Sequence, residues 1–340
     1  MNAETISTYT TKSPTRVDLA GGTLDMWPLF NFVGGATTIN LAIDIWTTAE
    51  IKTRHDRRIL IRSADLNKEW HFENISEFFL SKDTSLDFYK IIFVPFKTAL
   101  EKLNHGFEMM TVSQSPIGGG LGGSSSLTIS ILKSLHQLLK ISLPLTHDLV
   151  HLAHNLESEM LRTPTGTQDY YPAVTGGLSF IDYYTQNIVQ TVSAIEDTPF
   201  TDHFLLVYTG RSHKSGLNNF EVLKSAVAGD EKVLNALNEI KKVADDLKDI
   251  IRAKNWSAIP ALFRREFAAR VQLTPAFTSP EIEKLAEICL AAGALAVKIC
   301  GAGGGGCVLV WVPPSNRERV VSACQSEKFQ CLNAKPVSPL

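Results

Sequence analysis

The sequence has no excess of charge of either sign, and this limits what the protein can bind. Its 340 residues include 33 lysines and arginines and 35 acidic residues, so the formal net charge is −2 at pH 7. A protein that works mainly on nucleic acid needs a basic surplus to neutralise phosphates. We therefore expect no nucleic-acid partner.

Long hydrophobic runs are also missing. A membrane-spanning helix is recognised by about 18 or more consecutive apolar residues, and the sequence contains no such run. Residues 1–12 are polar where a secretion signal has an apolar core. We therefore expect a cytoplasmic protein without a membrane partner. The hydrophobic fraction of 44% is nevertheless typical of a folded globular chain.

Cysteines are few, and their spacing excludes two kinds of site. None of the five belongs to a C-x-x-C pair, so we expect neither a zinc site nor a redox motif. We expect small, buried, reduced thiols, as in a cytosolic protein. The cysteines are all close to the C-terminal end: Cys289, Cys300, Cys307, Cys324 and Cys331.

Several nucleotide-binding signatures are absent. There is no G-x-x-x-x-G-K-[ST] motif, which excludes a P-loop NTPase, and the H-R-D and D-F-G motifs of protein kinases are missing. Gly118, Gly120 and Gly123 match G-x-G-x-x-G. A dinucleotide site also has an acid about 20 residues later, and the sequence there reads ISLPLTHD. An NAD-dependent oxidoreductase is therefore a poorly supported alternative.

The predicted strands and helices occur in groups, which favours an α+β architecture. The length suggests about two domains, and we place them at residues 1–195, rich in strands, and 196–340, rich in helices. One predicted helix runs from Ser124 to Lys140 and the next from Thr146, as its N-cap, to about Arg162. Residues 217–292 are mainly helical. Strands are predicted at residues 35–54, 58–63, 107–113, 176–184, 204–208, 295–300 and 307–313.

The most informative segment is Ser115 to Ser126, with five glycines in six residues between a predicted strand and a predicted helix. Glycine permits positive φ and close backbone approach, and a helix N-terminus offers free N–H groups and partial positive charge. This pattern predicts a polyphosphate cradle; a flexible turn capped by serine is the alternative. The cradle residues are Pro116, Gly118, Gly119, Gly120, Leu121, Gly122, Gly123, Ser124, Ser125 and Ser126.

Three further segments contain candidate residues. Lys298 to Cys307 is a second glycine cluster, between two strands, which predicts a hairpin-like turn pressed against a loop or ligand; a purely structural bend is the alternative. A strand with Arg16 leads into Gly21, Gly22 and Asp25. Arg16 either neutralises a phosphate or a nearby carboxylate, or is a surface strand residue. Asp25 either accepts hydrogen bonds from hydroxyl groups or forms a turn. Glu157 borders the apolar stripe of its helix and is either a surface acid or one directed into a cleft. Asp169 lies in a Gly/Pro-bounded loop, where a catalytic group can be presented.

Together and in this order, these motifs resemble the GHMP kinases, the superfamily of galactokinase, homoserine kinase and mevalonate kinase, over residues 13–313. SPTRVDLAGGTLD followed by GGATTINLAID is most similar to the fucokinase and heptose-kinase branch. One departure is Gln168-Asp169-Tyr170, where Gln-Asp-Gln is usual in that branch. The departure leaves the identity of the acceptor open, whereas the position of the family's aspartate is still matched by Asp169.

The resemblance implies a two-domain fold, with an N-terminal mixed sheet and helices and a C-terminal ferredoxin-like domain. It implies ATP as the ligand of the cradle, and Mg²⁺ bound by Glu157 and Ser124, with Ser125 as the other serine candidate. It also implies two catalytic residues. Asp169 accepts the proton of the substrate hydroxyl or orients that hydroxyl, and Arg16 is the basic residue beside this aspartate and the transferring phosphoryl group. The implied substrate-binding residues are Asp25, Gly21, Gly22, Gly301, Gly303 and Gly304.

The expected function is therefore an ATP- and Mg²⁺-dependent kinase that phosphorylates a hydroxyl of a sugar or sugar phosphate, as a monomer or homodimer. A mevalonate-type kinase and a sugar or ATP sensor without turnover are the alternatives. His213 and Lys214 either face the acceptor or belong to a charged surface loop.

Overall fold

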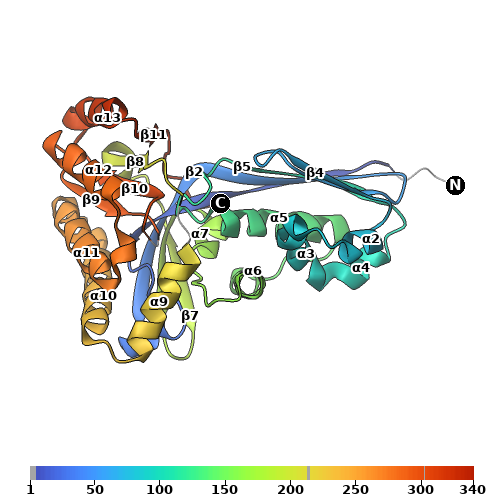
Figure 1. Ribbon diagram of the computed structural model, residues 1–340, viewed down its shortest axis with the longest axis horizontal. Helices are drawn as coiled ribbons and strands as arrows, with labels where there is room; N and C mark the ends of the chain where they lie inside the picture. The colour runs from blue at the N-terminus through green and yellow to red at the C-terminus, as the bar shows by residue number, and fades with distance from the viewer. Residues whose placement is uncertain (1–4, 213–214, 302) are drawn as a thin grey trace.

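A computed structural model describes residues 5–212, 215–301 and 303–340 of the chain. Two β-sheets form the two ends of an elongated molecule, and helices cover one side of each (Figure 1). The N-terminal sheet has seven strands in the order β4-β3-β5-β2-β6-β7, with β1 paired to β2. The C-terminal sheet has four strands in the order β11-β8-β10-β9. This confirms the two-domain α+β fold.

The long strand β2 (Ala36–Thr53) organises the N-terminal sheet. It pairs with β1 (Thr8–Ala20) in antiparallel fashion along almost its whole length. The remaining neighbours share the other edge, since β6 (Leu178–Tyr183) pairs with the first part of β2 and β5 (Phe107–Ser113) with the second part. The inner half of β1 is buried, so residues of β1 reach the centre of the molecule.

Helix α5 (Gly123–Leu139) packs on β1 and β2 through small polar residues as well as its apolar stripe. Ser126 donates a hydrogen bond to the Ser13 carbonyl, Ser130 to the Thr47 carbonyl and Ser134 to the Ala49 carbonyl. Small side chains let the helix approach the strands closely, and each buried hydroxyl has a partner. The N-terminus of α5 is thereby fixed next to β1.

The C-terminal sheet has β-α-β-β-α-β connectivity with additional helices, which agrees with the expected ferredoxin-like arrangement. Its helix α10 (Glu231–Arg252) packs against β2. The last residues return to the N-terminal sheet through bridges between Ile43 and Pro336 and between Gly176 and Pro339, so the C-terminus lies near α7 (Figure 1). The N-terminal strands end at residue 193 and β8 begins at 204; the boundary at 195 stays a prediction.

The remaining elements are short or lie at the periphery. The other strands are β3 (Ile59–Ser63), β4 (Lys68–Phe72), β7 (Ile188–Ser193), β8 (Phe204–Tyr208), β9 (Ala296–Ile299), β10 (Cys307–Trp311) and β11 (Gln330–Leu332). The other helices are α1 (Leu29–Phe32), α2 (Ile75–Leu80), α3 (Asp87–Phe93), α4 (Lys97–Glu101), α6 (Thr146–Leu161), α7 (Tyr170–Thr175), α8 (Phe200–His203), α9 (Ser215–Val227), α11 (Ile259–Leu273), α12 (Pro280–Ala291) and α13 (Arg317–Ser326).

One expected detail is wrong. Thr146 is the first residue of α6 rather than its N-cap; the cap position belongs to Leu145, and no side chain caps this helix. All five cysteines are free thiols, and all except Cys331 are buried. None of the helices in the described ranges is both long and apolar enough to cross a bilayer.

Lys133 of α5 generates a stability prediction because its ammonium group is largely buried beside weak partners. The Ser13 hydroxyl and the Ala173 carbonyl both lie 3.4 Å from Nζ. Burial lowers the Lys133 pKa to about 8. The cost of the charge is therefore full below pH 8 and fades as the pH rises toward the ordinary lysine value of about 10.4.

We expect Lys133→Met to raise the melting temperature at pH 7 by about 2 °C, because an unpaired buried cation is removed. The gain should shrink between pH 8 and about pH 10, as followed by circular dichroism. Lys82→Met, at an exposed position, is the control and should change little. A gain that does not depend on pH would contradict the electrostatic cause.

Candidate functional site

A cavity of about 370 Å³ lies where the glycine loop, α5, α6 and the loop after β9 meet. Thirteen of the predicted site residues line it. They come from four separate parts of the chain: Arg16 and Asp25; Pro116, Gly118, Gly119, Gly120, Gly122, Gly123, Ser124 and Ser125; Glu157 and Asp169; and Gly301. The fold therefore brings together residues that the sequence motifs keep far apart.

The glycine loop requires glycine for two reasons: a positive φ angle, and close packing that leaves no room for a Cβ atom. Gly122, which caps the N-terminus of α5, has φ +70°, and a Cβ there would lie 3.1 Å from the Asp169 carboxyl group. A Cβ at Gly119 would lie 2.8 Å from the Pro116 carbonyl oxygen. The loop therefore places the free N–H groups of a 17-residue helix at the cavity wall, as an anion-binding site requires.

Arg16 and Asp169 form an ion pair in the cavity wall, in which the Arg16 side chain is buried and the Asp169 side chain is 25% exposed. Arg16 Nε donates to Asp169 Oδ1 at 2.8 Å, and a second guanidinium nitrogen contacts the same oxygen. The third nitrogen donates to the Gly120 carbonyl at 2.7 Å and the Cys300 carbonyl at 3.0 Å. Burial opposes the charge, but Asp169 and Asp18 raise the Arg16 pKa overall, so the guanidinium stays protonated.

Glu157 of α6 faces the N-terminus of α5. The Tyr170 hydroxyl donates to Glu157 Oε2 at 2.5 Å, and the Ser125 hydroxyl approaches Oε1 at 3.5 Å. Ser124 is exposed and has no such contact. Burial raises the Glu157 pKa to about 7. One carboxylate and one hydroxyl are donors that fit Mg²⁺, which takes one or two carboxylates together with substrate phosphates.

Asp25 lines the same cavity and is 5% exposed. It accepts the Gln168 backbone N–H at 3.1 Å, and Gly166 leaves room for it, since a Cβ at Gly166 would lie 1.8 Å from Asp25 Oδ2. Burial, followed by the nearby Asp169 charge, raises the Asp25 pKa to about 6. Gln168 Oε1 is buried at the cavity wall without a hydrogen-bond partner.

Six predicted site residues do not line the cavity. Leu121 and Ser126 point into the core, where Leu121 joins an apolar cluster. Gly21 and Gly22 are packed against the Thr37 carbonyl and the Asp18 carboxylate, respectively. Gly303 is packed against the Phe277 backbone, and Gly304, at φ +74°, belongs to the same turn. These positions shape the loops, so the expected direct contact of the four glycines with a ligand has no support in the cavity geometry.

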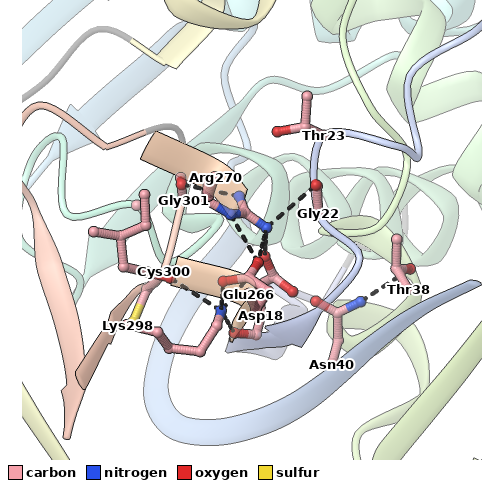
Figure 2. Close-up of polar contacts among 12 residues, drawn as sticks. Asp18, Gly22, Thr23, Thr38, Asn40, Glu266, Arg270, Lys298, Cys300 and Gly301 are labelled. Carbon is pink, nitrogen blue, oxygen red and sulfur yellow. Dashed lines mark hydrogen bonds and ion pairs between the residues drawn. The ribbon is translucent and has the colours of Figure 1, made fainter. Parts of the chain in front are cut away.

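Several residues at the cavity were not predicted from the sequence. Arg270 of α11 lines it, and Thr23 reaches Asn219 of α9 at 3.4 Å, so the C-terminal helices form part of the wall. Arg270 belongs to a buried cluster of charged residues, together with Asp18, Glu266 and Lys298 (Figure 2). The only sequence signal was that Asp18 and Lys298 lie inside two of the motifs. His213 and Lys214 lie outside the described residues.

Comparisons with known proteins match nearly the whole of this chain. The model of the GHMP kinases N terminal domain matches residues 91–177, and that of the GHMP kinases C terminal domain matches residues 243–330. A D-glycero-alpha-D-manno-heptose 7-phosphate kinase from Campylobacter jejuni is 26% identical over 327 residues, which is 95% of each chain.

Two solved structures share the fold. The mevalonate kinase of Methanococcus jannaschii has a TM-score of 0.78 and 24% identity, over 97% of this chain and 99% of that chain. A D-glycero-D-manno-heptose 1-phosphate kinase from Bacteroides thetaiotaomicron has a TM-score of 0.77 and 20% identity, over 98% and 97%. The overall fold is therefore shared by kinases of different acceptors, mevalonate and a heptose phosphate, and does not distinguish between them.

The raised pKa of Asp25 predicts that this carboxylate costs stability at neutral pH. Because the folded-state pKa of about 6 exceeds the ordinary value of about 3.9, the cost is present above pH 6 and absent below about pH 4. We expect Asp25→Asn to raise the melting temperature at pH 8, and to lose this advantage near pH 4. Asp197→Asn, at an exposed position, is the control; equal shifts in both variants would refute the burial argument.

Proposed function

Because the chain belongs to the GHMP kinase family, we propose that it is an ATP-dependent kinase that transfers the γ-phosphate to a hydroxyl of a sugar or sugar phosphate. The observation that carries this proposal is that the N–H groups of the glycine loop and the Arg16–Asp169 ion pair share one cavity. Phosphoryl transfer requires little more than anion binding, alignment and a carboxylate beside the attacking hydroxyl.

At the nucleotide end, backbone N–H groups of the glycine loop and of the α5 N-terminus bind the phosphates. Glu157 and Ser125 are the proposed holders of Mg²⁺, supported by their mutual approach at 3.5 Å. When bound, this ion neutralises charge on the transferring phosphoryl group and its neighbours. Tyr170 keeps Glu157 oriented by donating a hydrogen bond to it.

At the acceptor end, Asp169 is the proposed base. The acceptor hydroxyl oxygen bonds to the γ-phosphorus, the bond from that phosphorus to the β-phosphate oxygen breaks, and the hydroxyl proton passes to the Asp169 carboxylate. Arg16 keeps Asp169 in place through two contacts to one oxygen, which leaves the other carboxylate oxygen available. Arg16 is itself fixed by the Gly120 and Cys300 carbonyls, and it holds Asp169 in turn, as alignment of an in-line displacement demands.

The charges around the cavity support a hydroxyl-bearing part of the acceptor, and not an anionic part, beside Asp25 and Asp169. These two carboxylates would repel the carboxylate of mevalonate and equally the phosphate of a sugar phosphate, so any anionic group of the acceptor has to lie away from them. Among the lining residues that the structure describes, the cations Arg16 and Arg270 are already paired with carboxylates. Gln168 Oε1 lacks a partner and needs a hydrogen-bond donor, which a hydroxyl supplies. A sugar satisfies these groups.

A mevalonate-type kinase is the second candidate, because a mevalonate kinase shares the fold over 97% of this chain. Measurement of ADP release across aldoses, heptose phosphates, fucose and mevalonate separates the two candidates. We expect the highest kcat/KM with a sugar or sugar phosphate. Preferential turnover of mevalonate would overturn the acceptor class, and acceptor binding without ADP release would support a sensor.

Asp169→Asn tests the base directly. We expect kcat to fall by about 10²–10⁴-fold, the usual contribution of general base catalysis, because the amide cannot accept the proton. Binding of a non-hydrolysable ATP analogue should change little, since the glycine loop is intact; this measurement also verifies that the variant is folded. Wild-type turnover in the variant would show that Asp169 is not the base.

The two serines at the start of α5 form a matched pair. Because Ser125, and not Ser124, lies against Glu157, we expect Ser125→Ala to raise the Mg²⁺ concentration required for half-maximal activity several-fold. Ser124→Ala should leave the Mg²⁺ titration close to that of the wild type. The reverse result would assign the metal to Ser124.

A further inference from the structure

A cluster of four charged residues, fully removed from solvent, joins the two domains behind the cavity (Figure 2). It consists of Asp18 on β1, Glu266 and Arg270 on α11, and Lys298 on β9. Arg270 lies 2.7 Å from Asp18 and 2.5 Å from Glu266, and Lys298 lies 3.8 Å and 3.6 Å from the same two carboxylates. The two cations and two anions balance in charge.

Stability alone is a poor reason for such a cluster. Desolvation of buried charges roughly cancels their attraction, and apolar replacements of buried ion pairs are often neutral or stabilising. The cluster is also incompletely hydrogen-bonded, because Asp18 Oδ1 and Glu266 Oε2 have no hydrogen-bond partner. A network that contributes little net stability, yet borders a cavity, points to a geometric role.

The cations of this region bind three consecutive carbonyl groups that begin with the last residue of β9. Lys298 Nζ donates to the Ile299 carbonyl at 3.1 Å, Arg16 to the Cys300 carbonyl at 3.0 Å, and Arg270 to the Gly301 carbonyl at 3.3 Å. Gly301 is packed on the glycine loop, since a Cβ there would lie 3.0 Å from the Gly120 Cα. The position of Gly301 therefore affects the nucleotide loop.

Arg270 also reaches the acceptor end of the cavity. It donates to the Gly22 carbonyl at 3.2 Å, immediately before Thr23 and close to Asp25 in the same loop. Gly22 is packed tightly, because a Cβ there would lie 2.2 Å from Asp18 Oδ2 and 2.9 Å from the Arg270 guanidinium. One planar guanidinium thus connects the loop that carries Asp25 to the loop that supports Gly120.

We propose that Arg270 is a positioning residue for phosphoryl transfer: its guanidinium sets the spacing between the Gly22–Asp25 acceptor loop and the Gly301 loop behind the nucleotide. Asp18 and Glu266 balance its charge and fix its orientation. Each of the three guanidinium nitrogens of Arg270 donates a hydrogen bond to another protein group. Arg270 therefore acts through these loops and not by binding phosphate. This role rests on the proposed kinase function.

The main test variant is Glu266→Gln combined with Arg270→Met, which removes one charge of each sign and leaves Asp18 paired with Lys298. We expect kcat on the best acceptor to fall by about 10²-fold, as for a displacement of about 1 Å between reacting groups. The KM for the acceptor should rise more than the KM for ATP, because Gly301 keeps its contact with Gly120 while the Gly22 loop loses its only bond to Arg270.

The matched control is Asp182→Asn combined with Lys248→Met. This pair, 2.5 Å apart, also joins the C-terminal helices to the N-terminal sheet, but it does not line the cavity. The control should keep the wild-type kcat and both KM values. Active sites are counted by titration with an ATP analogue, so that loss of folded protein is not read as loss of kcat.

Arg270→Lys is the second variant, in case the double replacement does not fold. It keeps the charge, but a single ammonium group lacks the planar fork that serves both carbonyls. We expect the same rise in acceptor KM and a smaller loss of kcat. Wild-type kinetics in folded Arg270→Lys, or equal losses in the control pair, overturn the positioning role. A wild type that phosphorylates no acceptor overturns the proposed function instead, and with it this role.

Discussion

The geometry of the cavity depends on one buried guanidinium, that of Arg16. It binds the Gly120 carbonyl, the Cys300 carbonyl and the Asp169 carboxylate, which lie 104, 284 and 153 residues away along the chain. An arginine can do this because it offers five donors in a rigid planar fork. Burial makes each contact costly to lose. The glycine loop, the second glycine cluster and the proposed base are therefore held in one arrangement by a single side chain.

Two carboxylates of the cavity are buried in surroundings that disfavour their charged form. Burial raises the pKa of Asp25 to about 6 and that of Glu157 to about 7, so neither carboxylate is placed where it is most stable as an ion. Perturbed carboxylates gathered in one cleft are characteristic of functional sites. The four-charge cluster behind the cavity follows the same principle, because it orders two loops while it adds little net stability.

Much of the fold could be predicted from local patterns. The predicted strands at 35–54 and 107–113 and the helix from Ser124 correspond to β2, β5 and α5, because their apolar periodicity is strong and long. The strands β4 and β7 were not predicted, because neither has a buried apolar face, whereas the equally short predicted strands β3 and β8 are largely buried. The helices α2 to α4 were not predicted, since 5 to 7 residues give too few turns for a clear pattern.

By itself, the sequence determined the chemistry that is available: a glycine loop at a helix start, and Arg16, Glu157 and Asp169 in motifs that resemble those of one kinase family. Only the tertiary structure decided which of these groups meet. Ser124 and Ser125 differ by about 100° around a helix, so the starting point of α5, fixed by Gly122, determines which one faces Glu157. Glu266 and Arg270 read as an ordinary pair one helical turn apart, and only the packing of α11 against β1 and β9 places them inside the protein. Spacing along a chain specifies local neighbours, whereas burial and long-range contact arise from the packing of whole elements.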